Sequence, residues 1–170
     1  NEVFWDVKEA KSEQDLAYLV SETKKSAFSV AISMKYDVFL NELHQEVFPD
    51  LLNEEGKVGA RITSKVEANN TLTIYKYASI VTSQNYKKEQ IIEAGTRRVE
   101  KAHAIKFDQL FEDHKNLWEK NWSHSDIVID GDEKAQQAIR FNIFHLNQTY
   151  SGKDERLNIG PKGFTGEKYG

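Results

Sequence analysis

The fold of this chain is decided by the stretch Phe28-Ser29-Val30-Ala31-Ile32-Ser33-Met34-Lys35-Tyr36. Large apolar side chains occupy every second position, and serine, alanine or lysine occupies the positions between them. A period of two is typical of a β-strand with one buried face, because successive side chains point to opposite sides of a sheet. We therefore predict a strand whose buried face is formed by Phe28, Val30, Ile32, Met34 and Tyr36.

A second region of alternating residues lies between Val58 and Val81. Apolar and polar residues alternate from Val58 to Val66, and Thr71 to Val81 is rich in β-branched and aromatic residues. Asn69-Asn70 separates the two runs, and asparagine tolerates the positive φ angles of a tight turn. The pattern predicts a hairpin, whereas the mixed stretch Val38–Asn53 predicts irregular structure.

After Ser83 the apolar period becomes that of a helix. One helix is predicted over 88–103, although Gly95 weakens it, and a second over 107–122. Residues of the second fall on one stripe, namely Phe107, Leu110, Phe111, His114, Leu117, Trp118 and Trp122. We interpret His114, Trp118 and Trp122, at four-residue spacing, as core packing rather than as a ligand site.

A third helix is predicted from about Asp132 to Tyr150, because Asp130 followed by Glu133 resembles a capping box. Its apolar residues cover more than one side: Ala138, Ile139, Phe141, Ile143, Phe144, Leu146 and Tyr150. Such a helix has to lie between neighbours. Together with a start without Met and a glycine-rich end, this feature predicts that the chain is part of a longer protein.

Composition excludes several classes of function. The 23 Lys and Arg residues are interleaved with 27 Asp and Glu residues, so we expect no nucleic acid and no membrane as partner. The chain has no cysteine, which excludes disulfides and thiolate metal sites, and its histidines lack metal-ligand spacing. No apolar run is long enough to span a bilayer, and we expect a cytoplasmic protein.

The stretch 158–170 is a glycine-rich loop, with glycines at 160, 163, 166 and 170 beside Pro161. It offers groups that can bind a sugar or an anion: Lys162, Thr165, Glu167, Lys168 and Tyr169. A plain surface loop is the alternative, and the residue order is not that of a P-loop. No carboxylate in the chain is identified by its spacing as a catalytic acid.

The segment 139–150, followed by the loop 158–170, resembles the maltose phosphorylases of glycoside hydrolase family 65. The linker of the same family is resembled by the upstream residues His114, Trp118, Trp122, Ser125-Asp126-Ile127 and Gly131-Asp132. The strands match only in general. The resemblance implies a multidomain β + α fragment. Residues 1–86 would be the C-terminal part of a β-sandwich, 87–131 a helical linker, and 132–170 the first helix and active-site loop of an (α/α)6 barrel.

The implied reaction is inverting phosphorolysis of maltose to β-glucose 1-phosphate and glucose, with inorganic phosphate as co-substrate and with no metal or organic cofactor. In the family a Glu downstream of this loop is the general acid. The resemblance therefore assigns no catalytic residue to these 170 residues, and we expect the fragment alone to be inactive. It also suggests that the parent protein is a homodimer.

The resemblance assigns substrate-binding residues only in the loop: Lys162, Gly163, Phe164, Thr165, Gly166, Glu167 and Tyr169. Relatives acting on trehalose or kojibiose tend to have Arg-Gly-Leu-Thr-Gly at this place, so Lys162 and Phe164 favour maltose. Two alternatives stay open. The parent protein is a phosphorylase for trehalose, kojibiose or nigerose, or the chain is a non-catalytic carbohydrate-binding module.

Overall fold

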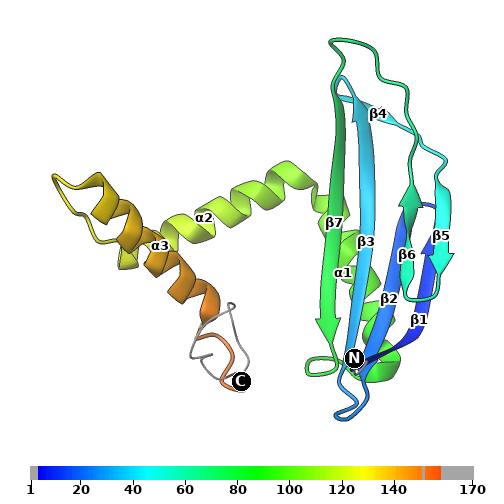
Figure 1. Ribbon diagram of the computed structural model, residues 1–170, viewed down its shortest axis with the longest axis horizontal. Coiled ribbons are helices and arrows are strands. Elements are labelled where there is room, and N and C mark those ends of the chain that lie inside the picture. The colour runs from blue at the N-terminus through cyan, green and yellow to red at the C-terminus, as the bar shows by residue number, and fades with distance from the viewer. Residues whose placement is uncertain (1–3, 151, 158–170) are drawn as a thin grey trace. The chain divides into compact units, whose positions relative to one another are not determined.

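The computed structural model describes residues 4–150 and 152–157, and shows a β region followed by helices (Figure 1). The chain divides into two compact units, Asn1–Phe111 and Glu112–Gly170. The predicted order of strands followed by helices is therefore confirmed, whereas the (α/α)6 barrel and the boundaries at 86 and 131 stay predictions. Among the described residues, no helix is long and apolar enough to cross a membrane.

The first unit is built on a five-stranded antiparallel sheet with β3 at its centre. Its strands are β1 (Trp5–Glu13), β2 (Leu16–Thr23), β3 (Ser29–Leu40), β4 (Leu43–Gln45) and β7 (Leu72–Thr82). A smaller hairpin of β5 (Asp50–Glu54) and β6 (Lys57–Arg61) contacts β1 and β2. Ser12 fastens the hairpin, since its hydroxyl donates to the Leu52 carbonyl at 2.9 Å and accepts from the Gly59 amide at 2.9 Å.

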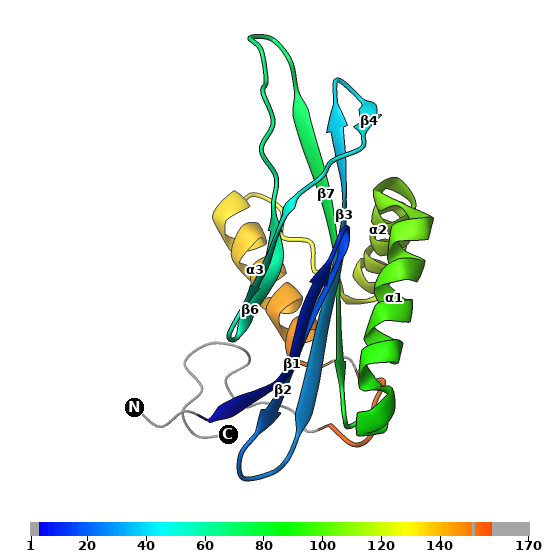
Figure 2. The ribbon, with the colours of Figure 1, turned by 90° about the vertical axis from the view of Figure 1, so that its right-hand side faces the viewer.

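The strand predicted at 28–36 is confirmed as β3, but of its predicted buried face only Tyr36 is buried. Ala31 and Ser33 are 1% and 0% exposed, whereas Ile32 on the opposite face is 44% exposed. Helix α1 (Ile91–Ile105) packs along the face with the small residues (Figure 2). Small side chains permit a close approach of the helix, so burial here follows from residue size rather than from hydrophobicity.

The predicted hairpin over 58–81 is also wrong. β6 pairs with β5, and β7 pairs with β3 in a register that places Leu72 opposite Leu40 and Thr82 opposite Val30. The prediction of a positive φ is confirmed at Asn69, where φ is 69°. Likewise, 38–53 is not irregular, because it holds the end of β3, all of β4 and most of β5.

The three predicted helices are present as α1, α2 (Phe107–Ser125) and α3 (Glu133–Thr149), and a short 3-10 turn, η1 (Lys88–Gln90), precedes α1. The capping residue of α3 is Asp132 rather than Asp130, because the Asp132 carboxylate accepts from the Ala135 amide at 3.0 Å. This bond satisfies an amide of the first turn that has no partner within the helix.

Gly95 marks the closest approach of α1 to the sheet. The Ser79 hydroxyl donates to the Gly95 carbonyl at 2.6 Å. A Cβ atom at Gly95 would lie 2.8 Å from Ser33 Oγ and 3.4 Å from Val81 Cγ2. The buried Ser33 Oγ has no hydrogen-bond partner among the described residues. The glycine that weakens this helix in isolation is thus required by its packing.

We predict that Gly95→Ala lowers the free energy of unfolding by about 1–3 kcal/mol, since the added methyl overpacks the contact with Ser33. Adding Ser33→Ala removes the hydroxyl nearest to the new methyl and should recover part of that loss. Urea unfolding of the single and double variants measures both effects. In an exposed helix, Gly→Ala raises the free energy of unfolding by about 1 kcal/mol. Such a rise for Gly95→Ala alone would contradict the close contact with Ser33.

Candidate functional site

All seven residues predicted to bind substrate lie outside the described residues: Lys162, Gly163, Phe164, Thr165, Gly166, Glu167 and Tyr169. Their role stays a prediction. The described residues closest to them in sequence include an ion pair, in which Arg156 donates to both carboxylate oxygens of Asp154 at 2.8 and 2.6 Å. Arg156 lowers the pKa of Asp154 to about 2, so this carboxyl is ionised at neutral pH and cannot serve as a general acid.

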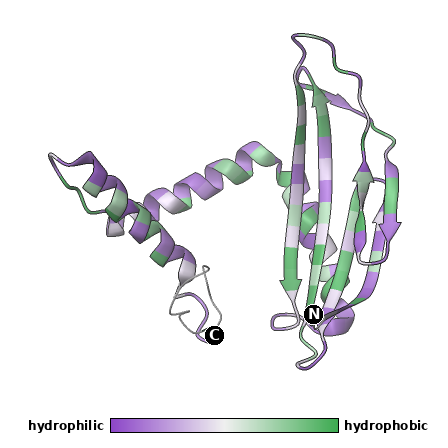
Figure 3. Ribbon diagram, in the orientation of Figure 1, coloured by the Kyte–Doolittle hydropathy of each residue, from purple (hydrophilic) through white to green (hydrophobic). Residues whose placement is uncertain are grey.

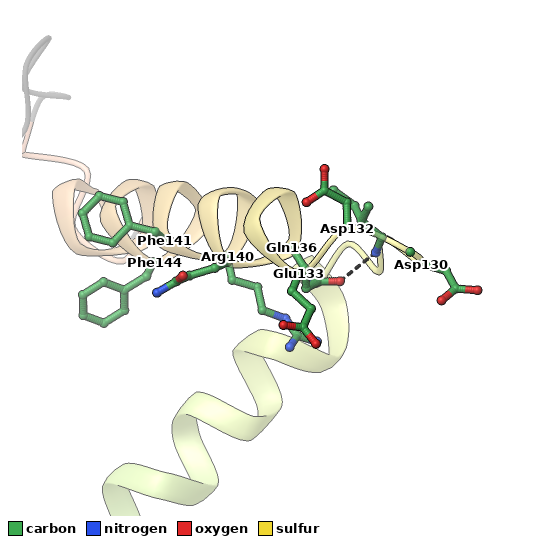
Figure 4. Close-up of a pocket in the computed structure, with 10 residues that line it drawn as sticks. Asp130, Asp132, Glu133, Gln136, Arg140, Phe141 and Phe144 are labelled. Carbon is green, nitrogen blue, oxygen red and sulfur yellow. Dashed lines mark hydrogen bonds between the residues drawn. The ribbon is translucent and has the colours of Figure 1, made fainter.

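A cavity of about 830 Å³ lies beside the first turns of α3 and the segment that leads into it (Figure 4). Carboxylates, amides and aromatic rings line it: Ile129, Asp130, Gly131, Asp132, Glu133, Gln136, Gln137, Arg140, Phe141 and Phe144. These are group types that can contact a sugar, with rings for its apolar face and polar groups for its hydroxyls. Their contacts show which of them are already engaged.

Gln136 holds the segment before α3 in place. Its Oε1 accepts from the Ile129 amide at 2.7 Å (Figure 4), and its Nε2 donates to the Ile127 carbonyl at 2.8 Å. Both backbone groups belong to an extended stretch without regular secondary structure. Gln136 therefore provides hydrogen-bond partners for backbone groups that have none in a β-sheet.

Arg140 ties the same segment to α3 one turn further along. Its Nε and Nη2 donate to the two oxygens of Asp126 at 2.9 and 2.6 Å. Hydrogen bonds from Arg140 hold the pKa of the Asp126 carboxyl below its usual range, so Asp126 is an ionised anchor and not a proton donor. Asp132, Gln136 and Arg140 follow each other at four-residue steps on one helix face, a signal that the sequence analysis missed.

Aromatic rings connect α2 to α3 within the second unit. The ring centroid of Trp118 lies 5.1 Å from that of Phe144 and 6.1 Å from that of Trp122. Trp118 and Trp122 therefore make packing contacts, but no residue of α2 is buried, so the interpretation of these residues as core packing is not confirmed. Figure 3 shows hydrophobic and hydrophilic bands along both helices, and Phe141 and Leu146 of α3 are largely exposed. Among the described residues of α3, only Ile143 is buried.

The cavity is therefore built mainly by groups that position α3. Asp132 caps the helix, Gln136 holds the preceding backbone, and Arg140 is paired with Asp126. In the part of the chain that the structure describes, no group of three or more His, Asp or Glu side chains could hold a metal ion. The geometry supports a structural junction that leads towards the predicted loop, and we assign no reaction to the cavity itself.

We predict that Gln136→Met loosens the junction, because it removes both side-chain bonds and keeps a similar volume. The Ile129 amide should then exchange with solvent about fivefold faster or more, the factor expected for one lost bond of about 1 kcal/mol. Residue-resolved hydrogen exchange measures this, with Gln137→Met as the matched control on the next position. Equal exchange of Ile129 in the two variants would show that Gln136 does not hold this backbone.

Comparisons with known proteins agree on one family. Residues 1–121 match the family described as "Glycosyl hydrolase family 65, N-terminal domain", and residues 140–170 match its "central catalytic domain". A maltose phosphorylase of Bacillus subtilis (strain 168) is 31% identical over 169 residues, which are 99% of this chain and 22% of that protein.

Two further relatives are named as phosphorylases of other disaccharides. An alpha,alpha-trehalose phosphorylase of Thermoanaerobacter brockii is 32% identical over 89% of this chain and 19% of its own length. A kojibiose phosphorylase of Caldanaerobacter subterraneus is 38% identical over 62% of this chain and 14% of its own length. The chain thus spans about a fifth or less of these relatives. Because the N-terminal domain match alone extends over residues 1–121, more than half of the sequence, the chain belongs to glycosyl hydrolase family 65.

Proposed function

We propose that this chain is part of an inverting disaccharide phosphorylase that converts maltose and phosphate into β-glucose 1-phosphate and glucose. The observation that supports it most directly is the similarity to a protein named maltose phosphorylase along 99% of this chain. In this reaction phosphate attacks the anomeric carbon from the face opposite the leaving glucose, and a carboxylic acid protonates the departing oxygen.

In this proposal the described residues have a supporting role. The first unit provides the sheet and α1, and the second unit provides the junction that leads through α3 to the loop at 162–169. That loop borders the sugar, and its glycines allow the backbone to approach the substrate closely. The acid that protonates the leaving group belongs to another part of the parent protein, which we propose to be a cytoplasmic homodimer that needs no metal or organic cofactor.

A second candidate is a phosphorylase for another α-glucosyl disaccharide. Relatives named for trehalose, kojibiose and nigerose are 32%, 38% and 26% identical to this chain over shorter stretches than the maltose phosphorylase. The relatives named here are phosphorylases, and none of their names favours a non-catalytic carbohydrate-binding module.

We predict that the intact protein containing this chain consumes maltose only when phosphate is present, and releases β-glucose 1-phosphate and glucose in equal amounts. The assay compares maltose, trehalose, kojibiose and nigerose, each with and without phosphate, and the 170-residue chain alone serves as an inactive control. A higher kcat/KM for another disaccharide would change only the substrate assigned in the proposal and would leave the phosphorolysis unchanged. Glucose release without phosphate would identify a hydrolase and overturn the proposal.

We further predict that replacing Lys162 by Arg together with Phe164 by Leu shifts the preference away from maltose. A changed apolar contact beside the sugar alters discrimination by about tenfold or more. The measurement is the ratio of kcat/KM for maltose to that for kojibiose in the intact protein. Lys134→Arg, a change at an exposed position of α3 outside the loop, is the control. An unchanged ratio in the double variant would show that this loop does not select the substrate.

A further inference from the structure

The break between α1 and α2 has no local cause in the sequence. Helix α1 ends at Ile105 and α2 begins at Phe107, so that Lys106 alone separates them. No glycine or proline occurs between Thr96 and Ser125, and nothing in that stretch prevents one continuous helix. The break must therefore come from contacts with other parts of the fold.

Lys106 adopts a backbone conformation that is essentially restricted to glycine. Its φ is 70° and its ψ is 162°, a region where the Cβ atom of an L-residue collides with the backbone. Such a conformation persists only where surrounding contacts hold it. The neighbours of Lys106 on β3 and β7 provide those contacts.

The central contact is the carboxylate of Asp37 on β3, whose side chain is 6% exposed. Lys106 Nζ donates to Asp37 Oδ2 at 2.8 Å, and His103 Nε2 lies 2.7 Å from Asp37 Oδ1. Burial raises the pKa of Asp37, but the hydrogen bonds from Lys106 and His103 lower it by more, so the carboxyl is held in its charged form. Lys106 is 52% exposed, so only Asp37 is buried in this pair, and it keeps His103 as a partner when Lys106 is removed.

Strand β7 contacts Phe107, the first residue of α2 after the break. The Phe107 ring stacks on Tyr75 with a centroid distance of 5.1 Å, and Tyr75 meets Phe39 of β3 at 5.6 Å. These ring contacts hold the first residue of α2 against β7 and, through Tyr75, against β3.

We propose that Asp37 is a positioning residue whose buried carboxylate holds Lys106 in its glycine-like conformation and so keeps α1 and α2 as two separate helices. Without that charge, residues 91–125 relax into one continuous helix. This inference concerns the backbone between the helices and does not depend on the substrate of the parent protein.

The test is residue-resolved hydrogen exchange of the intact protein with Asp37→Asn and Lys106→Met. In a continuous helix the Asp108 amide gains the Ala104 carbonyl as acceptor, so its exchange should slow by about fivefold to tenfold in both variants. Lys101→Met removes an equal charge from an exposed position of α1 and should leave Asp108 unchanged.

A rescue variant separates conformation from simple loss of stability. In Asp37→Asn combined with Lys106→Gly, residue 106 adopts the same φ without strain, so the exchange of Asp108 should return to the wild-type rate. An unchanged Asp108 rate in Lys106→Met, or equal slowing in Lys101→Met, would overturn the proposal. If Asp37→Asn unfolds the protein, exchange accelerates throughout β3. In that case the Asp108 rate in Lys106→Met tests the proposal, because Lys106 is 52% exposed and its loss leaves the core intact.

Discussion

The close packing of α1 on β3 and β7 is the constraint on which the first unit depends. It requires small side chains at Ala31 and Ser33 and no side chain at all at Gly95, while Val99 and Ile91 fill the space between helix and sheet. Large apolar residues of β3 such as Ile32 are thereby turned to the other face. The same contact brings the end of α1 within reach of Asp37, so helix packing and helix termination are linked.

Polar side chains near both ends of α2 bond to neighbouring segments of the chain. At its start Asp37 bonds to the side chains of His103 and Lys106, and beyond its end Gln136 and Arg140 bind the segment that leads to α3. This structural role of the polar contacts is consistent with a chain of glycosyl hydrolase family 65 that matches the N-terminal domain and the start of the catalytic domain.

Sequence reasoning located the helices and the central strand because those signals are local. The period of two around Ala31 and the apolar stripe through Trp118 both lie within one element. It failed for strand pairing, since β7 finds its partner more than 30 residues earlier in β3, past the nearer β6. It also missed Asp37, whose partners His103 and Lys106 are 66 and 69 residues away. The four-residue spacing of Asp132, Gln136 and Arg140 is a local signal, but the groups that Gln136 and Arg140 bond to became visible only in three dimensions.

By itself the sequence determined the central strand, the three helices that follow the strands and the family resemblance over 110–170, because periodicity and motifs are properties of neighbouring residues. Tertiary structure alone decided which face of β3 is buried, which strand β7 pairs with and why a helix without glycine or proline breaks at Lys106. Burial and pairing depend on what approaches from elsewhere in the chain. A buried carboxylate can impose a backbone conformation that no local preference of lysine would select.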